Sequence, residues 1–161
     1  MLIDPPQEPA EHAEATGPQL LERMLCDQIP LTHALGIRVG AYDGQSLVLH
    51  APFERNTNHK CTVFGGSLYA VAVLSGWGLL YLALHDQGLK GHIVIQASTV
   101  AYELPGTSDF EARSHLPEDA VFERFLKLYR KRGKARLTLS SEIYSQGKRL
   151  FTFEGRYVAH T

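Results

Sequence analysis

The feature that most constrains this chain is an uncharged segment from Cys61 to Leu84, which contains no Asp, Glu, Lys or Arg. A helix of this composition has no polar face, so other elements must enclose it or it must lie in a membrane. Its length would suffice for a membrane span. Four glycines within it, and no Lys/Arg cluster at its far end, favour the enclosed helix. We therefore predict a buried helix from about Gly66 to His85 and no membrane association.

The start of this helix is the main candidate for chemistry, because the sequence there is Phe64-Gly65-Gly66-Ser67. Glycine lets another molecule approach the backbone closely. The first N–H groups of a helix have no partner inside it, and the helix dipole adds partial positive charge. Such N–H groups stabilise a carbonyl oxygen as negative charge develops on it, which favours acyl chemistry. A structural alternative is that the two glycines only let the sheet pass close to the helix.

The totals limit the class of protein. A chain of 161 residues with 44% hydrophobic and 20% charged residues is typical of one globular domain. A net charge of −1 gives no overall attraction to nucleic acid. Two cysteines are too few for a disulfide framework, so we expect a cytoplasmic protein. The first residues are acidic and proline-rich rather than basic and then apolar, so we expect no signal peptide. Residues 1–16 are rich in Pro, Glu and Ala and are predicted to form a flexible tail before a single domain, residues 17–161.

Alternating hydrophobic residues and turn residues predict the other elements. They are a helix from Pro18 that Pro30 stops, strands 37–42 and 47–51, a polar loop 52–60, strands 91–103 and 108–115, a helix 117–133, and a hairpin of strands 134–144 and 149–158. In the first strand Ile37, Val39 and Ala41 share one face. We predict an α+β fold in which a curved, largely antiparallel sheet wraps around one long central helix. A closed barrel would leave that helix without a place. The exposed sheet edge favours a dimer with a continuous sheet.

Two motifs carry a resemblance to a known family. The segment Asn58–Leu68 resembles the active-site loop of hotdog-fold acyl-CoA thioesterases. Phe64–Tyr69 and Gly76–Leu79 are more closely similar to the thioesterase family found as the C-terminal domain of a bacterial acetyltransferase-like protein. The similarity covers roughly residues 28–159, and 161 residues leave no room for the acetyltransferase domain.

The resemblance implies a hotdog fold and a bacterial thioester hydrolase. It implies that an acyl-CoA or related acyl thioester binds between the two protomers of a homodimer, and it leaves open whether dimers pair as tetramers. Coenzyme A would enter as part of the substrate, with no separate cofactor. The thioester carbonyl would lie at Gly65 and Gly66, while Phe64 and Ser67 would contact the substrate.

The sequence offers three candidates for the group that activates or positions the attacking water. Related thioesterases use a carboxylate, and the matching positions here are near Asn58 and at Val73; residues 55–85 contain no Asp or Glu. Asn58 could orient a water, His59 could accept its proton, and Ser75 could position it. Each has a structural alternative: Asn58 caps a turn, His59 is a solvated loop residue, and Ser75 bonds back to its own helix.

A run of cations follows in the second helix and the strand after it: Arg124, Lys127, Arg130, Lys131, Arg132, Lys134 and Arg136. Acidic residues at the start of that helix and basic residues at its end match the helix dipole, so the run needs no nucleic-acid partner. Arg132 is a candidate for the phosphates of coenzyme A.

The remaining motifs exclude several classes. The eight histidines form no recognised metal-binding spacing, so no metal site is expected. Nucleophile-elbow, P-loop and dinucleotide motifs are absent from the sequence. Two alternatives to an acyl-CoA thioesterase stay open: a non-catalytic acyl-thioester binding protein, and a hotdog enoyl-CoA hydratase.

Overall fold

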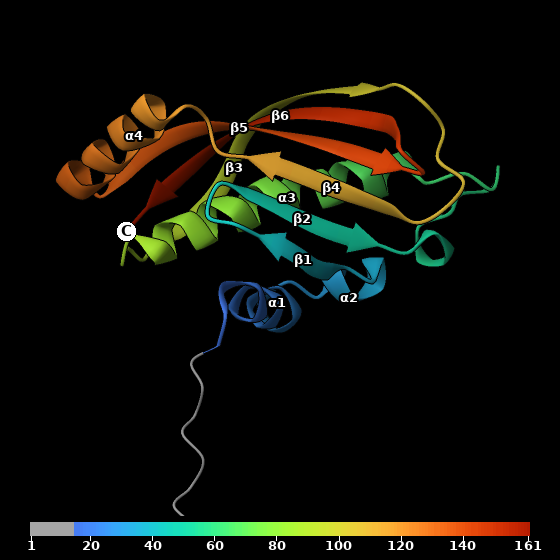
Figure 1. The fold of residues 1–161 in the computed structure, drawn as a ribbon, viewed down its shortest axis with the longest axis horizontal. Coiled ribbons are helices and arrows are strands. Elements are labelled where there is room, and N and C mark those ends of the chain that lie inside the picture. Colours follow the sequence, from blue (N-terminus) through green and yellow to red (C-terminus); the bar gives the residue numbers. More distant parts are fainter. Residues whose placement is uncertain (1–14) are drawn as a thin grey trace, which may run out of the picture.

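The structure, a computed structural model, describes residues 15–161. A six-stranded sheet curves around the long helix α3, Gly65–Asp86 (Figure 1). The predicted α+β class, with a curved antiparallel sheet around one central helix, is confirmed. The predicted flexible tail, residues 1–16, lies outside the described residues except for its last two positions.

The sheet has the order β1-β2-β4-β5-β6-β3, and every neighbouring pair is antiparallel. Its strands are β1 (Arg38–Tyr42), β2 (Ser46–Ala51), β3 (His92–Tyr102), β4 (Phe110–His115), β5 (Lys134–Ser145) and β6 (Lys148–His160). Alternate residues of β2, such as Leu47 and Leu49, are fully buried against α3, as the alternation predicted. The predicted β5–β6 hairpin is present and turns at Gln146-Gly147.

The other helices are α1 (Gly17–Gln28), α2 (Leu31–Leu35), the short 3-10 helix η1 (Phe53–Arg55) and α4 (Asp119–Arg132). The first helix ends before Pro30, as predicted, and Pro30 is the N-cap of α2, a short helix that was not predicted. Proline is tolerated at the start of a helix, where no N–H bond is lost. The Thr32 hydroxyl donates to the carbonyl oxygens of Leu25 (3.0 Å) and Ile29 (2.8 Å), which ties α2 to the end of α1.

Helix α3 is enclosed over most of its length. It is the one helix within residues 15–161 that is long and apolar enough to cross a membrane, and 72% of that stretch is buried. Tyr157 of β6 is fully buried and donates its hydroxyl to the Val73 carbonyl oxygen at 2.8 Å. A Cβ on Gly76 would collide with the Tyr157 phenol, so Gly76 lets β6 approach the helix closely.

The predicted alternation in the first strand was wrong at its end. A β-bulge between Val39 and Tyr42 shifts the register, and Ala41 is exposed. Tyr42 turns inward instead and donates its hydroxyl to Asp86 Oδ2 at 2.6 Å, next to the end of α3. Burial raises the pKa of Tyr42, and the Asp86 carboxylate adds to the shift.

The two edges of the sheet differ. At the β1 edge, α1 lies alongside, and the Val39 N–H donates to Glu22 Oε2 at 2.9 Å. At the other edge, no described strand pairs with the outer side of β3, and residues 96–99 are exposed. Helix α3 begins near one end of β3 and finishes near the other (Figure 1).

Candidate active site

Helix α3 begins with unpaired backbone donors. Its N-cap, Phe64, provides no side-chain hydrogen bond to the first turn. The N–H groups of Ser67 and Leu68 both donate to the Phe64 carbonyl oxygen, at 3.0 and 3.1 Å. Within the described residues, the N–H groups of Gly65 and Gly66 have no acceptor. Two donors at the positive end of a 22-residue helix are therefore available to a ligand.

Two aromatic rings flank these donors. Phe64 and Tyr102 keep 55% and 58% of their surface exposed. A Cβ on Gly65 would lie 3.0 Å from Tyr102 Cε1, and a Cβ on Gly66 would collide with the Phe64 ring. The Tyr102 hydroxyl donates to the Gly65 carbonyl oxygen at 3.3 Å. Gly66 is nevertheless exposed and Gly65 half-buried, so the helix start is an open surface between two rings.

The loop before the helix is organised by Asn58. A bridge between Thr57 and Val63 closes the loop. Asn58 Oδ1 accepts from the Lys60 N–H (2.9 Å), the Thr62 N–H (3.2 Å) and the Thr62 hydroxyl (3.2 Å), and Asn58 Nδ2 donates to Thr62 Oγ1 (2.9 Å). The Asn58 amide is thus engaged in an Asx-type turn.

His59 lies at the tip of the same loop. Its imidazole is exposed and makes no hydrogen bond within the described residues. His59 is therefore a basic group that a ligand at the loop can reach.

Asn56, which was not predicted from the sequence, fixes the loop to the rest of the domain. Asn56 is buried, and its Nδ2 donates to the carbonyl oxygens of Leu35 (2.8 Å) and Pro52 (2.7 Å). Its own carbonyl oxygen accepts from the Phe64 N–H at 2.7 Å. Asn56 therefore sets the position of the helix start. Nothing in the sequence separates it from Asn58, because both stand in one polar loop.

Ser75 lies away from the helix start. It comes ten residues after Gly65, about 15 Å along the helix axis. Its hydroxyl accepts from the Ser114 hydroxyl at 2.7 Å, Ser114 bonds to Ser141, and the Ser141 hydroxyl donates to the Ala72 carbonyl oxygen at 3.2 Å. All three serines are buried between α3 and the strands β4 and β5. The structure does not bring Ser75 together with Gly65 and Gly66.

The other two predicted contact residues lie in different settings. Ser67 is buried in the first turn of α3. Arg132 is exposed at the last position of α4, and α4 lies at the end of the molecule where α3 finishes rather than where it begins (Figure 1). Within one chain, Arg132 is therefore not part of the helix-start site.

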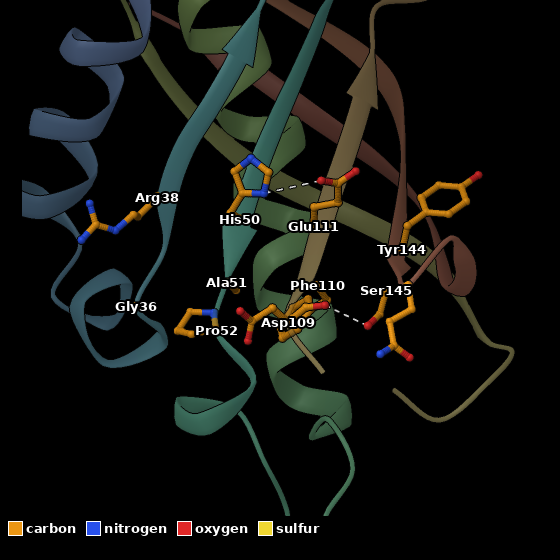
Figure 2. A pocket seen from close by; sticks show the side chains of 11 residues that line it. Gly36, Arg38, His50, Ala51, Pro52, Asp109, Phe110, Glu111, Tyr144 and Ser145 are labelled. Carbon is orange, nitrogen blue, oxygen red and sulfur yellow. Dashed lines mark hydrogen bonds and ion pairs between the residues drawn. The ribbon is translucent and has the colours of Figure 1, made fainter. Parts of the chain in front are cut away.

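A separate cavity of about 490 Å³ lies across β1, β2, β4 and β5 (Figure 2). His50 Nδ1 lies 3.5 Å from Glu111 Oε2, and Asp109 Oδ1 accepts from the Phe53 N–H at 2.8 Å. Arg38 reaches the same cavity. His50 and Glu111 face each other across β2 and β4, and the cavity does not include the start of α3. We therefore place the candidate active site at α3.

Metal ligands do not gather in the described part of the chain: residues 15–161 contain no group of three His, Cys, Asp or Glu side chains that could hold a metal ion.

Comparison with solved structures defines the class of protein. A protein of unknown function from Chlorobaculum tepidum is 30% identical with a TM-score of 0.84, over 88% of this chain and 93% of that one. A putative thioesterase from Shewanella oneidensis is 27% identical with a TM-score of 0.79, over 90% and 98%. A thioesterase from Haemophilus influenzae, at 17% identity and a TM-score of 0.67 over 91% of each chain, shares the fold. The chain is a hotdog-fold thioester hydrolase.

The family follows from the sequence match. Residues 18–161 match the family described as "Putative thioesterase (yiiD_Cterm)". The chain belongs to this thioesterase family, which is the family that the Phe64–Tyr69 and Gly76–Leu79 motifs indicated.

Proposed function

We propose that this chain hydrolyses acyl-CoA thioesters at the start of α3. The observation that carries the proposal is the pair of N–H groups without an acceptor at half-buried Gly65 and exposed Gly66. Water attacks the carbonyl carbon, and the oxygen becomes an oxyanion that these donors stabilise. The C–S bond then breaks, the carboxylic acid leaves, and the coenzyme A sulfur takes a proton. Hydrolysis needs only water, a proton acceptor and a polarised carbonyl, so we propose no separate cofactor.

The open edge of β3 supports a homodimeric site. Antiparallel pairing of two β3 strands about a two-fold axis brings the His92 end of one strand beside the Tyr102 end of the other. An apolar cavity of about 380 Å³ lies at the start of β3 and is lined by residues that include Tyr81, Leu84 and Ile93. In such a dimer this cavity comes to the partner's helix start, where we propose that it takes the acyl chain.

Two residues of the loop have different proposed roles. His59 is exposed with a free imidazole, so we propose that it accepts the proton of the attacking water. The Asn58 amide is bound to Thr62 and Lys60, so we propose that Asn58 positions the loop that carries His59. Arg132, at the β3-start end of the molecule, is proposed to contact the phosphates of coenzyme A.

The test is release of free thiol from acyl-CoAs of several chain lengths. We expect His59→Ala to lower kcat by about 10²–10⁴ with little change in KM. We expect Asn58→Ala to lower activity and thermal stability together, and Asn58→Asp, which keeps the Oδ1 acceptor for the Lys60 and Thr62 N–H groups, to retain most of each. Binding of acyl-CoA without thiol release would instead support the non-catalytic binding protein. Turnover of an enoyl-CoA to a hydroxyacyl-CoA would support the hydratase.

A further inference from the structure

A cluster of basic side chains lies on the outer face of the sheet, at the end where β3 begins. We name it the basic face and define it by five residues: Lys134, Arg136, Arg156, His92 and His160. Strand register brings them together, because His160 of β6 pairs with both Lys134 of β5 and His92 of β3. The two imidazole rings lie 5.5 Å apart, and Arg136 Nε donates to Gln96 Oε1 at 3.1 Å.

The cations of the basic face form no ion pairs with acidic side chains of the described chain. Lys134, Arg136 and Arg156 are exposed, and none takes part in an ion pair within residues 15–161. By contrast, two other arginines of the same sheet each pair with a glutamate: Arg113 with Glu111, and Arg149 with Glu103. Three cations without an ion-pair partner on one surface favour an acidic partner.

The shape of the basic face favours a protein rather than a nucleotide. Its residues do not line any of five cavities found in the described chain, whereas small ligands bind in concave sites. From Lys134 to the position opposite Arg156 is four residues along β5, about 13 Å. Acidic residues one and two turns apart on a helix are spaced at about 5 and 11 Å, which matches cations spread over this length. Exposed Val94 adds an apolar contact within the face.

The location of the basic face connects it with the reaction. It lies at the end of the molecule where α3 finishes, opposite the start of α3 (Figure 1). In the dimer proposed above, the basic face of one protomer therefore comes to the same end as the partner subunit's helix start. We propose that it docks the acidic helical surface of an acyl carrier protein, whose pantetheine arm delivers the acyl thioester to that helix start. This inference rests on the proposed function and names the carrier of its substrate.

The experiment compares one acyl group on two carriers. Hydrolysis of octanoyl and palmitoyl groups is measured on a bacterial acyl carrier protein and on coenzyme A. The variant carries Lys134→Glu, Arg136→Glu and Arg156→Glu. The control carries Arg23→Glu, Arg124→Glu and Lys148→Glu, three exposed cations away from the basic face with no ion pair in the described chain. We expect the variant to lose at least about tenfold in kcat/KM on the carrier protein, with acyl-CoA turnover and the control unchanged.

Binding of holo-carrier protein, followed by fluorescence anisotropy, separates the two proposals. If no thioester is hydrolysed but the carrier protein binds through the basic face, the proposed function fails and the docking inference stands. The inference is overturned if the wild-type chain hydrolyses acyl-CoA but neither binds nor hydrolyses the acylated carrier protein. It is also overturned if the triple variant lowers turnover on both carriers equally, which indicates contact with the coenzyme A phosphates. Binding of duplex DNA through the basic face, without binding of the carrier protein, would likewise overturn the inference.

Discussion

Replacement of Gly66 by proline removes one N–H group from the proposed oxyanion site and little else. Gly66 is the second residue of α3, where proline is tolerated because no intrahelical N–H bond is lost. The chain already contains this arrangement, since α1 begins with Gly17-Pro18. Gly66→Ala is the matched control, because it adds the same Cβ beside the Phe64 ring and keeps the N–H. The Phe64 ring is 55% exposed and can turn away from that Cβ.

The two variants are expected to fold equally well and to differ in activity. The Gly66 N–H has no acceptor in the described chain, so its loss leaves no broken bond. We expect the two variants to differ by less than about 1 kcal/mol in free energy of unfolding. Loss of one oxyanion donor costs about 2.7–4 kcal/mol in the transition state, or about 10²–10³ in kcat.

The assay is thiol release from acyl-CoA at saturating substrate, with thermal unfolding of each variant alongside. We expect Gly66→Pro to have at most about a hundredth of the kcat of Gly66→Ala. A folded Gly66→Pro variant with the kcat of Gly66→Ala would refute the role of this N–H group.

Three further predictions concern stability and assembly. Gly76→Ala drives a Cβ into the buried Tyr157 phenol. We expect urea denaturation to show a net loss of about 2 kcal/mol in the free energy of unfolding, after the helix-propensity gain of about 1 kcal/mol is subtracted. A more stable variant would contradict this packing. Ala97→Arg, at the middle of β3, places two like charges near the two-fold axis of the proposed dimer. We expect this variant to be monomeric by analytical ultracentrifugation and the control Thr138→Arg, on the central strand β5, to stay dimeric. An Ala97→Arg dimer would argue against β3 pairing. Hydrogen bonds from neighbouring backbone N–H groups lower the pKa of Asp43, so its carboxylate stabilises the fold above the ordinary carboxyl pKa and this contribution is lost as the pH falls through the lowered value. Asp43→Ala should therefore be less stable than wild type at neutral pH, with the gap closing below about pH 4, and a gap independent of pH would count against this account.

The elements that depend on local pattern could be predicted from the sequence. The uncharged run around Leu74 required an enclosed helix, and the alternation of Leu47 and Leu49 required a half-buried strand. The bulge that turns Tyr42 inward was not predictable, because it depends on the pairing of β1 with β2 and on the position of Asp86. The position of a bulge and the direction of its side chains depend on contacts between residues far apart in the sequence, and local sequence patterns do not show those contacts.

Only part of the candidate site could be predicted, because some of its residues have no distinctive local sequence pattern. The helix start at Gly65 and Gly66 was readable because glycine and the end of a polar loop coincide there. The orientation of Ser75 was not, since a helix that is apolar on all sides gives no signal of which side faces the sheet. Asn58 has the same sequence signature whether it holds a water or caps a turn, and only its bonds to Thr62 show the turn.

The hydrogen bond from the Val39 N–H to the Glu22 carboxylate has a consequence for the size of any assembly. A strand ladder grows wherever both of its margins can accept another copy, which is how fibres arise. In this chain the first helix lies along one margin and Glu22 takes an N–H group there, which favours joining on the other margin. Two copies that meet there use up the single margin available to each, and sheet growth ends at a pair.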